Sequence, residues 1–303
     1  MTRPKLIILT CMRSYSSLIS AMLGQHSGLY TIPEINPFVR KALHETTTTF
    51  KQVRPRSLDG LFRMVAEFEF GRQNYDNIIK ARDWVAEHGD WTPAQLMEYV
   101  AEKVAPRIPV EKSPSTVVVQ GALDYAVQFC PDAYFLHLHR HPVSTTASIA
   151  KITRYGEGKG VTRASHLDPE TSWYDANKAI MDLSEQLPED RFISVRGEDV
   201  LSDPDRYLSM ICDWLGLVTS AQDLDDMRHP ERSPFSKYGP TNAPFGGDPN
   251  FLKDPIFSQR PIPALPLDAV LHWEPDQPDR RLRPDTVALS IQLGYGEGTE
   301  LQV

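Results

Sequence analysis

A short polar turn near the N-terminus carries side chains suited to binding an anion. It joins the apolar run 6–9, which predicts a buried strand, to a segment from Ser16 onward with apolar residues at helical spacing. Arg13 lies in the turn, and hydroxyl groups follow it at Ser14, Ser16 and Ser17. Backbone N–H groups at a helix start attract anions, and hydroxyls and a guanidinium add donors. The turn therefore predicts a phosphate or sulfate ligand.

The composition of this turn argues against ATP as the ligand. A Walker loop needs glycines and a lysine followed by serine or threonine, and that spacing is absent here. An ordinary strand-to-helix turn with a serine cap would explain the same residues. The turn alone leaves both interpretations open.

A second segment has the same strand, turn and helix pattern. The run 134–138 predicts a buried strand, Arg140 follows it, and Pro142 suits the first turn of a helix. Arginine offers a planar fork of donors to phosphate oxygens, which lysine cannot copy. Ser148 lies two helical turns further on and can face the same side. A surface ion pair and a helix-surface hydroxyl would also explain these two residues taken separately.

The two segments together resemble sulfotransferases that use PAPS (3′-phosphoadenosine 5′-phosphosulfate), most closely the soluble bacterial enzymes for small molecules. The resemblance implies that the first turn is the 5′-phosphosulfate loop, with the donor-binding residues Arg13, Ser14, Tyr15, Ser16 and Ser17. Tyr15 stands where the family usually has glycine, so it must keep a negative φ or accept strain.

The resemblance continues along the chain over roughly residues 4–218. It implies that Arg140 and Ser148 form the 3′-phosphate site. The stretch 111–114 matches a turn that precedes a helix, expected near 117–129, and 196–200 matches a later motif. Further on, Lys237 and Gly239 are candidates for a loop that closes over the nucleotide, although a structural wrapping segment explains them equally well.

Sulfuryl transfer needs a cation at the leaving phosphate and a base for the acceptor proton. We assign the first role to Arg13 and the second to Glu34, because a similar glutamate serves several sulfotransferases. Glu34 also follows an apolar segment whose end should face the ligand crevice. Capping a turn or pairing with Arg40 is the structural alternative. The turn at Lys112 lacks the histidine base of aryl sulfotransferases, and Lys112 itself is a further candidate for touching the sulfuryl group.

Composition and charge narrow the class of protein. The chain has 303 residues, 41% of them hydrophobic, and a net charge of −8, which argues against a nucleic-acid partner. The apolar run 6–9 is too short for a membrane span or a secretion signal. Three distant cysteines show neither metal spacing nor a disulfide framework, so we expect a cytoplasmic protein without a membrane partner. The resemblance implies PAPS as donor, PAP as product, and no metal.

The pattern of elements predicts a single α/β domain over 1–303 with the three-layer, P-loop-like sulfotransferase fold. Its core would span 1–218, and 219–303 would be an extension, because 12 of the 25 prolines lie between Pro230 and Pro284. We expect an irregular cover over 219–270 and a last helix over 282–293. Parallel strands are expected near 5–10, 29–32, 107–111, 134–139 and 191–195.

The acceptor is the least determined part of the prediction. We expect a hydroxyl or an amine of a small molecule, free or tethered to a carrier protein, in a cleft to which the apolar stretches 61–70 and 84–99 contribute. An atypical P-loop kinase and an inactive PAP-binding module are the alternatives. The oligomeric state is not encoded in any recognisable pattern.

Overall fold

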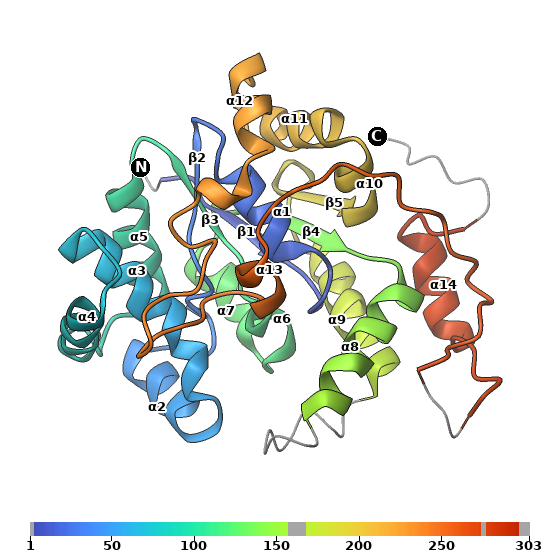
Figure 1. Ribbon diagram of the computed structural model, residues 1–303, viewed down its shortest axis with the longest axis horizontal. Helices are drawn as coiled ribbons and strands as arrows, with labels where there is room; N and C mark the ends of the chain where they lie inside the picture. The colour runs from blue at the N-terminus through green and yellow to red at the C-terminus, as the bar shows by residue number, and fades with distance from the viewer. Residues whose placement is uncertain (1–2, 157–167, 274–276, 297–303) are drawn as a thin grey trace.

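Five short parallel strands form the central sheet of the molecule, in the order β2-β3-β1-β4-β5 (Figure 1). The structure is a computed structural model that describes residues 3–156, 168–273 and 277–296. The strands are β1 (Leu6–Leu9), β2 (Leu29–Thr31), β3 (Ile108–Glu111), β4 (Tyr134–His139) and β5 (Phe192–Arg196). All five coincide with predicted strands to within two residues at either end.

Helices cover both faces of the sheet, as a parallel sheet requires. Successive residues of β1 point to opposite faces, so Leu6 and Ile8 pack in one core cluster and Ile7 and Leu9 in the other. The first cluster is covered by α1 (Ser16–Leu23), α10 (Gly197–Ser202), α11 (Pro204–Trp214) and α12 (Ala221–Met227). The second is covered by α2 (Leu43–Val53), α3 (Asp59–Phe70), α4 (Tyr75–Glu87), α5 (Pro93–Val104), α7 (Ala122–Phe129) and α9 (Pro169–Ser184).

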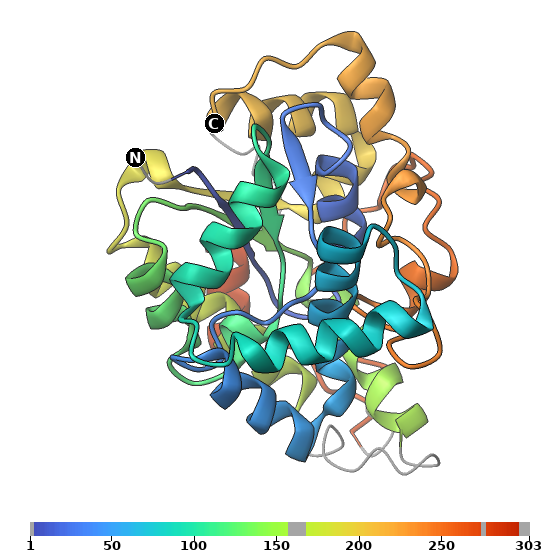
Figure 2. The same cartoon turned by 90° about the vertical axis from the view of Figure 1, so that its left-hand side faces the viewer.

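Figure 2 turns the left-hand side of Figure 1 toward the viewer and shows the helices of the segment between β2 and β3 in front of the sheet. The remaining helices are α6 (Ser115–Val118), α8 (Pro142–Gly156), α13 (Pro249–Lys253) and α14 (Pro284–Gln292). Short 3-10 helices occupy Pro55–Leu58 (η1), Glu189–Arg191 (η3) and Pro230–Arg232 (η4). Within the described residues no helix is long and apolar enough to cross a membrane.

Two predictions about helices need correction. The single helix expected near 117–129 is divided into α6 and α7, because Val119 is extended and Gly121 has a φ of 79°. The cover over 219–270 is not wholly irregular, since it contains α12, η4 and α13. Each of these helices begins with a proline in its first turn or with a capping serine. The prediction of an irregular segment rested on its high proline content and gave too little weight to these local signals for a helix start. The last helix, α14, lies within the range expected for it.

Candidate active site

The turn predicted to bind an anion connects β1 to α1 and is held in an unusual backbone conformation. Arg13 and Tyr15 have φ values of 69° and 64°, so the tyrosine adopts the left-handed conformation that glycine would adopt without strain. The Tyr15 ring lies under the Arg140 guanidinium, 4.2 Å from it, and close to Gly197. Among the described residues no side chain caps the start of α1, contrary to the serine-cap alternative, so the first N–H groups of the helix have no side-chain partner there.

Arg13 and Arg140 lie side by side at the carboxyl end of the sheet. Arg140 Nη1 donates to the Arg13 carbonyl oxygen (3.1 Å), and burial lowers the pKa of Arg140. Arg13 Nε donates to Ser148 Oγ (3.0 Å). The hydroxyl next to Arg140 is that of Ser144 (3.0 Å from Nε), one helical turn before Ser148. Sequence analysis missed Ser144, although its spacing of four residues from Arg140 was a usable signal.

Glu34 and Lys112 meet beside the same turn. The Lys112 side chain, 4% exposed, pairs with the Glu34 carboxylate and donates to Ser17 Oγ (3.0 Å). Arg40 instead donates to a neighbouring backbone carbonyl (2.7 Å), so it does not supply the ion pair considered for Glu34. One side chain from each of three segments, α1, the loop after β2 and the loop after β3, therefore converges at this point.

A buried polar network ties together the two loops that carry Glu34 and Lys112. The Asn36 backbone N–H donates to Ser113 Oγ (3.0 Å), and the Ser113 hydroxyl donates to the Glu111 carboxyl. Glu111 is fully buried, and its second oxygen, Oε2, has no hydrogen-bond partner among the described atoms. Burial raises the pKa of Glu111 to about 7. The network holds Glu34 and Lys112 in a fixed relation to each other.

A pocket opens beside Glu34 between α1, the end of β2 and the C-terminal cover. Small and hydroxyl-bearing side chains form much of its wall, and Thr31 Oγ1 and Ser236 Oγ are buried there without a hydrogen-bond partner within the described part of the chain. The stretches 61–70 and 84–99 contribute none of its lining residues. Trp84, Trp91 and Tyr99 instead pack against one another, with ring centroids 4.9–5.6 Å apart.

The C-terminal cover contacts the site through residues that the sequence analysis did not single out. Gly246 O accepts the Glu34 backbone N–H (2.8 Å). The Asp248 carboxylate pairs with Arg13, and its backbone N–H donates to Ser17 Oγ (3.2 Å). In the sequence, the two consecutive glycines before Asp248 are the feature that could have indicated a close approach of this segment to the site.

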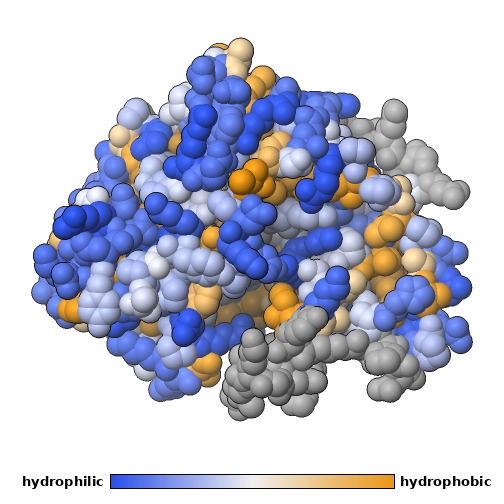
Figure 3. Space-filling view, in the orientation of Figure 1, coloured by the Kyte–Doolittle hydropathy of each residue, from blue (hydrophilic) through white to orange (hydrophobic). Residues whose placement is uncertain are grey.

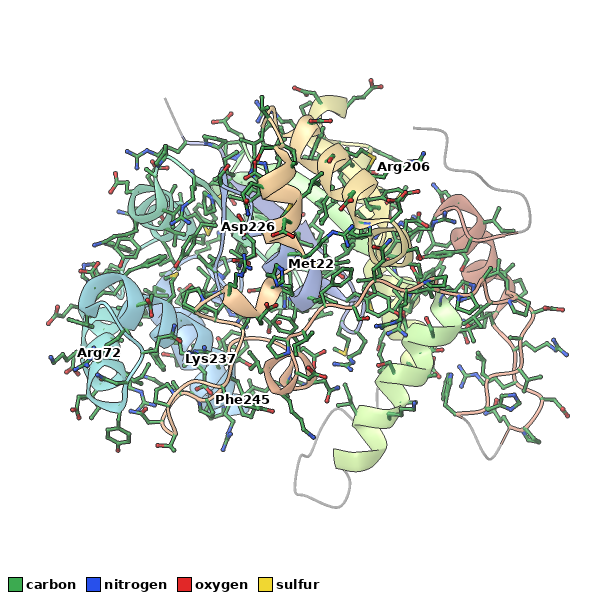
Figure 4. The ribbon with its side chains drawn as sticks, turned by 45° about the horizontal axis from the view of Figure 1, so that its top comes forward. Met22, Arg72, Arg206, Asp226, Lys237 and Phe245 are labelled. Carbon is green, nitrogen blue, oxygen red and sulfur yellow. The ribbon has the colours of Figure 1, made fainter. Side chains whose placement is uncertain are left out.

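The predicted nucleotide-closing residues lie elsewhere in the cover. The Lys237 carbonyl accepts a hydrogen bond from Arg63 of α3 (2.9 Å), and Gly239 packs against the same arginine. Figure 4 shows Lys237 and Phe245 beside the blue helices, whereas Met22 of α1 lies at the centre. The structure therefore does not bring Lys237 and Gly239 together with Arg13.

Two histidines of β4, His137 and His139, and Trp173 of α9 make structural contacts. His137 Nε2 lies 2.9 Å from Asn177 Oδ1, and burial lowers the pKa of His137 to about 4, so this imidazole is neutral at pH 7. His139 Nδ1 lies 2.9 Å from the Tyr295 hydroxyl. Trp173 is fully buried and donates to the Arg140 carbonyl (2.8 Å), which helps to fix the turn that follows β4. Among the described residues, no group of three or more His, Cys, Asp or Glu side chains could hold a metal ion.

Comparisons with known proteins identify the family and the fold. The chain belongs to the sulfotransferase family, whose model matches residues 4–221. Its structure is similar to the sulfotransferase domain from the curacin biosynthetic pathway, with 23% sequence identity and a TM-score of 0.76 over 97% of this chain and 98% of that one. It is also similar to the sulfotransferase domain of the Synechococcus PCC 7002 olefin synthase, with 25% identity and a TM-score of 0.73 over 97% and 95% of the two chains. A search of curated proteins finds no match. The predicted family and α/β fold are confirmed.

Proposed function

We propose that this sulfotransferase transfers the sulfuryl group of PAPS to a hydroxyl group of a small-molecule or carrier-tethered acceptor. The observation that carries the proposal is the convergence of Arg13, Ser17, Lys112 and Glu34 at the carboxyl end of the sheet. Three of these side chains can donate to an anion, and the fourth can accept a proton. Binding at this edge is typical of parallel α/β folds.

The residues around Arg13 suit the two anionic ends of PAPS. Arg13, the uncapped start of α1 and the Ser17 hydroxyl are suited to the 5′-phosphosulfate, and Ser14 Oγ is buried there without a hydrogen-bond partner among the described residues. Arg140, with Ser144 beside it, is suited to the 3′-phosphate, and Ser148, which accepts a hydrogen bond from Arg13, is a further donor candidate there. Since Arg140 also donates to the Arg13 carbonyl, the two parts of the donor site are held together.

Glu34 and Lys112 are suited to the chemical step. In the reaction we propose, the acceptor oxygen forms a bond to sulfur, the bond from sulfur to the phosphate oxygen breaks, and Glu34 takes the acceptor proton. Lys112 and Arg13 would stabilise the negative charge that develops on the sulfuryl group and the leaving phosphate. The buried Asn36–Ser113–Glu111 network would keep the base and the lysine in register.

The pocket beside Glu34 supports a polar acceptor. A buried hydroxyl without a partner is costly, by about 1–3 kcal/mol. The Oγ atoms of Thr31 and Ser236 have no hydrogen-bond partner in the part of the chain that the structure describes, so they favour an acceptor with a second hydrogen-bonding group. The two similar structures are domains of a biosynthetic pathway and of an olefin synthase, which supports an acceptor of secondary metabolism, including one carried by another protein. Figure 3 shows hydrophobic residues bordering a hollow near the middle of this face, where a longer acceptor chain would find apolar contacts.

Calorimetric titration of the protein with PAP, compared with ATP plus Mg²⁺, tests the donor assignment. We expect binding of PAP that is at least about tenfold weaker in Arg140→Ala, because charge-assisted hydrogen bonds are lost. Arg191→Ala is the matched control and should bind PAP as the wild type does. Arg191 directly precedes β5, so it lies at the amino end of the sheet, away from Arg140. A preference for ATP with Mg²⁺ would favour the kinase alternative and refute PAPS as donor.

Transfer of labelled sulfuryl from PAPS to a panel of alcohols tests the catalytic assignment. We expect Glu34→Gln to lower kcat by about 10²–10⁴ while the affinity for PAP stays within a few fold, because the base acts on the acceptor. Undiminished transfer by Glu34→Gln would show that another group takes the proton. Binding of PAP without transfer to any alcohol or amine would favour a non-catalytic PAP-binding module.

A further inference from the structure

Asp248 is an acidic residue placed where the proposed donor would put its own negative charge. Its carboxylate pairs with the Arg13 guanidinium, and its backbone N–H donates to Ser17 Oγ (3.2 Å). Arg13 and Ser17 are the donors assigned to the 5′-phosphosulfate. An acidic side chain has no evident use in a site for a polyanion, because like charges repel.

The contact between Asp248 and Arg13 is supported from several sides. Asp248 Oδ1 accepts the Asn250 backbone N–H (2.9 Å) and so caps α13, and the Tyr238 hydroxyl donates to the Pro249 carbonyl (3.0 Å). The preceding residues of the same segment, Gly246 and Gly247, line the acceptor pocket. The Asp248 and Arg13 side chains are 26% and 17% exposed, so a ligand arriving from solvent can reach and replace this ion pair.

We propose that Asp248 is a selectivity residue of the donor site, whose carboxylate occupies the anion position on Arg13 until a donor displaces it. The inference rests on the proposed function for the identity of that donor. Displacement lowers the affinity of every ligand that needs Arg13 by the same factor, so at a given concentration only a ligand with further contacts remains bound. A nucleotide whose second phosphate is held at Arg140 binds in spite of this loss of affinity. Free sulfate or phosphate can bind only at Arg13, where it competes with Asp248.

The contrary explanation is that Asp248 merely fastens the C-terminal cover to the donor turn. In that case the ion pair would order Arg13 for the donor, and its loss would weaken donor binding. The two explanations predict opposite signs for the change in affinity when the negative charge of Asp248 is removed.

The test is the pair of variants Asp248→Asn and Asp254→Asn. Asparagine keeps the helix cap at position 248. Asp254 is exposed at the end of the same helix, so its variant reproduces the change in net charge. The dissociation constant for PAP is measured by calorimetry, and the melting temperature is measured in sulfate against chloride at equal ionic strength.

We expect Asp248→Asn to bind PAP about tenfold more tightly than the wild type and to be stabilised by sulfate, because Arg13 is then free. Asp254→Asn should match the wild type in both measurements. The double variant Arg13→Ala/Asp248→Asn should lose the gain. An unchanged or weaker affinity for PAP in Asp248→Asn overturns the proposal when the wild type binds PAP.

The sulfate measurement separates this proposal from the proposed function. If no variant binds PAP but sulfate stabilises only Asp248→Asn, then Asp248 does occupy an anion site and the donor assignment is wrong. If the wild type and Asp248→Asn bind PAP equally and neither responds to sulfate, the donor assignment stands and the role of Asp248 is refuted. Absence of both effects refutes both.

Discussion

The buried carboxyl of Glu111 makes the stability of the fold depend on pH in a predictable direction. Burial raises its pKa from 4.5 to about 7, while the Ser113 hydroxyl and Lys112 oppose this rise. The folded protein therefore holds this proton more tightly than the unfolded chain does. The resulting stabilisation is complete below pH 4.5 and is lost as the pH rises toward 7.

The size of the effect follows from the two pKa values. Between pH 5 and pH 8 this single group is expected to lower the free energy of unfolding by about 2–3 kcal/mol. Glu111→Gln removes the titration but keeps the shape and an oxygen that can accept from Ser113. Its amide NH₂ stays buried at every pH, so it changes the absolute stability without adding a slope.

Urea unfolding of the wild type and Glu111→Gln at pH 5 and pH 8 isolates the contribution of Glu111 to the free energy of unfolding. We expect the wild type to lose about 2–3 kcal/mol more than the variant between pH 5 and pH 8, because all other titrating groups cancel in the comparison. Glu102→Gln, on the exposed side of α5, is the control and should keep the wild-type slope. Equal pH dependence in the wild type and Glu111→Gln would refute the claim that burial raises the pKa of Glu111 in the folded protein.

Three further predictions concern the frame of the site and its chemistry. Gly60→Ala should lower the free energy of unfolding by at least about 2 kcal/mol in urea, since an added Cβ would lie 2.1 Å from the Glu34 carbonyl oxygen. Gly71→Ala is its control. The space around Gly71 is open, so only its φ of 73° strains an alanine there, and the free energy of unfolding should fall by about 1 kcal/mol. Lys112→Met should reduce the kcat of sulfuryl transfer by about 10²–10³ with a smaller change in PAP affinity, and equal kcat would contradict its role in charge stabilisation. Burial raises the pKa of all three thiols, those of Cys11, Cys130 and Cys212, to about 12. A thiol reagent at pH 8 should therefore label no cysteine in the native protein and all three in urea.

Local patterns in the sequence were sufficient to predict the sheet and the turns at its carboxyl end. The apolar runs at 6–9 and 134–138 are long enough only for buried strands, and parallel strands bring their following turns to one edge. Arg13 and Arg140 were therefore predictable as neighbours without a structure. The same local logic failed at Gly121, where one residue in the left-handed conformation divides a predicted helix.

The pairing of side chains across the site was decided by the tertiary structure. Ser148 was assigned to Arg140 by its spacing, yet the packing of α8 turns it toward Arg13 and leaves Ser144 beside Arg140. Asp248 contacts Arg13 across 235 residues of sequence. Periodicity specifies which face of an element is buried, whereas a contact between distant segments depends on how the intervening elements pack. The sequence by itself therefore determined the fold class and the location of the proposed anion site, and the tertiary structure determined which side chains share it.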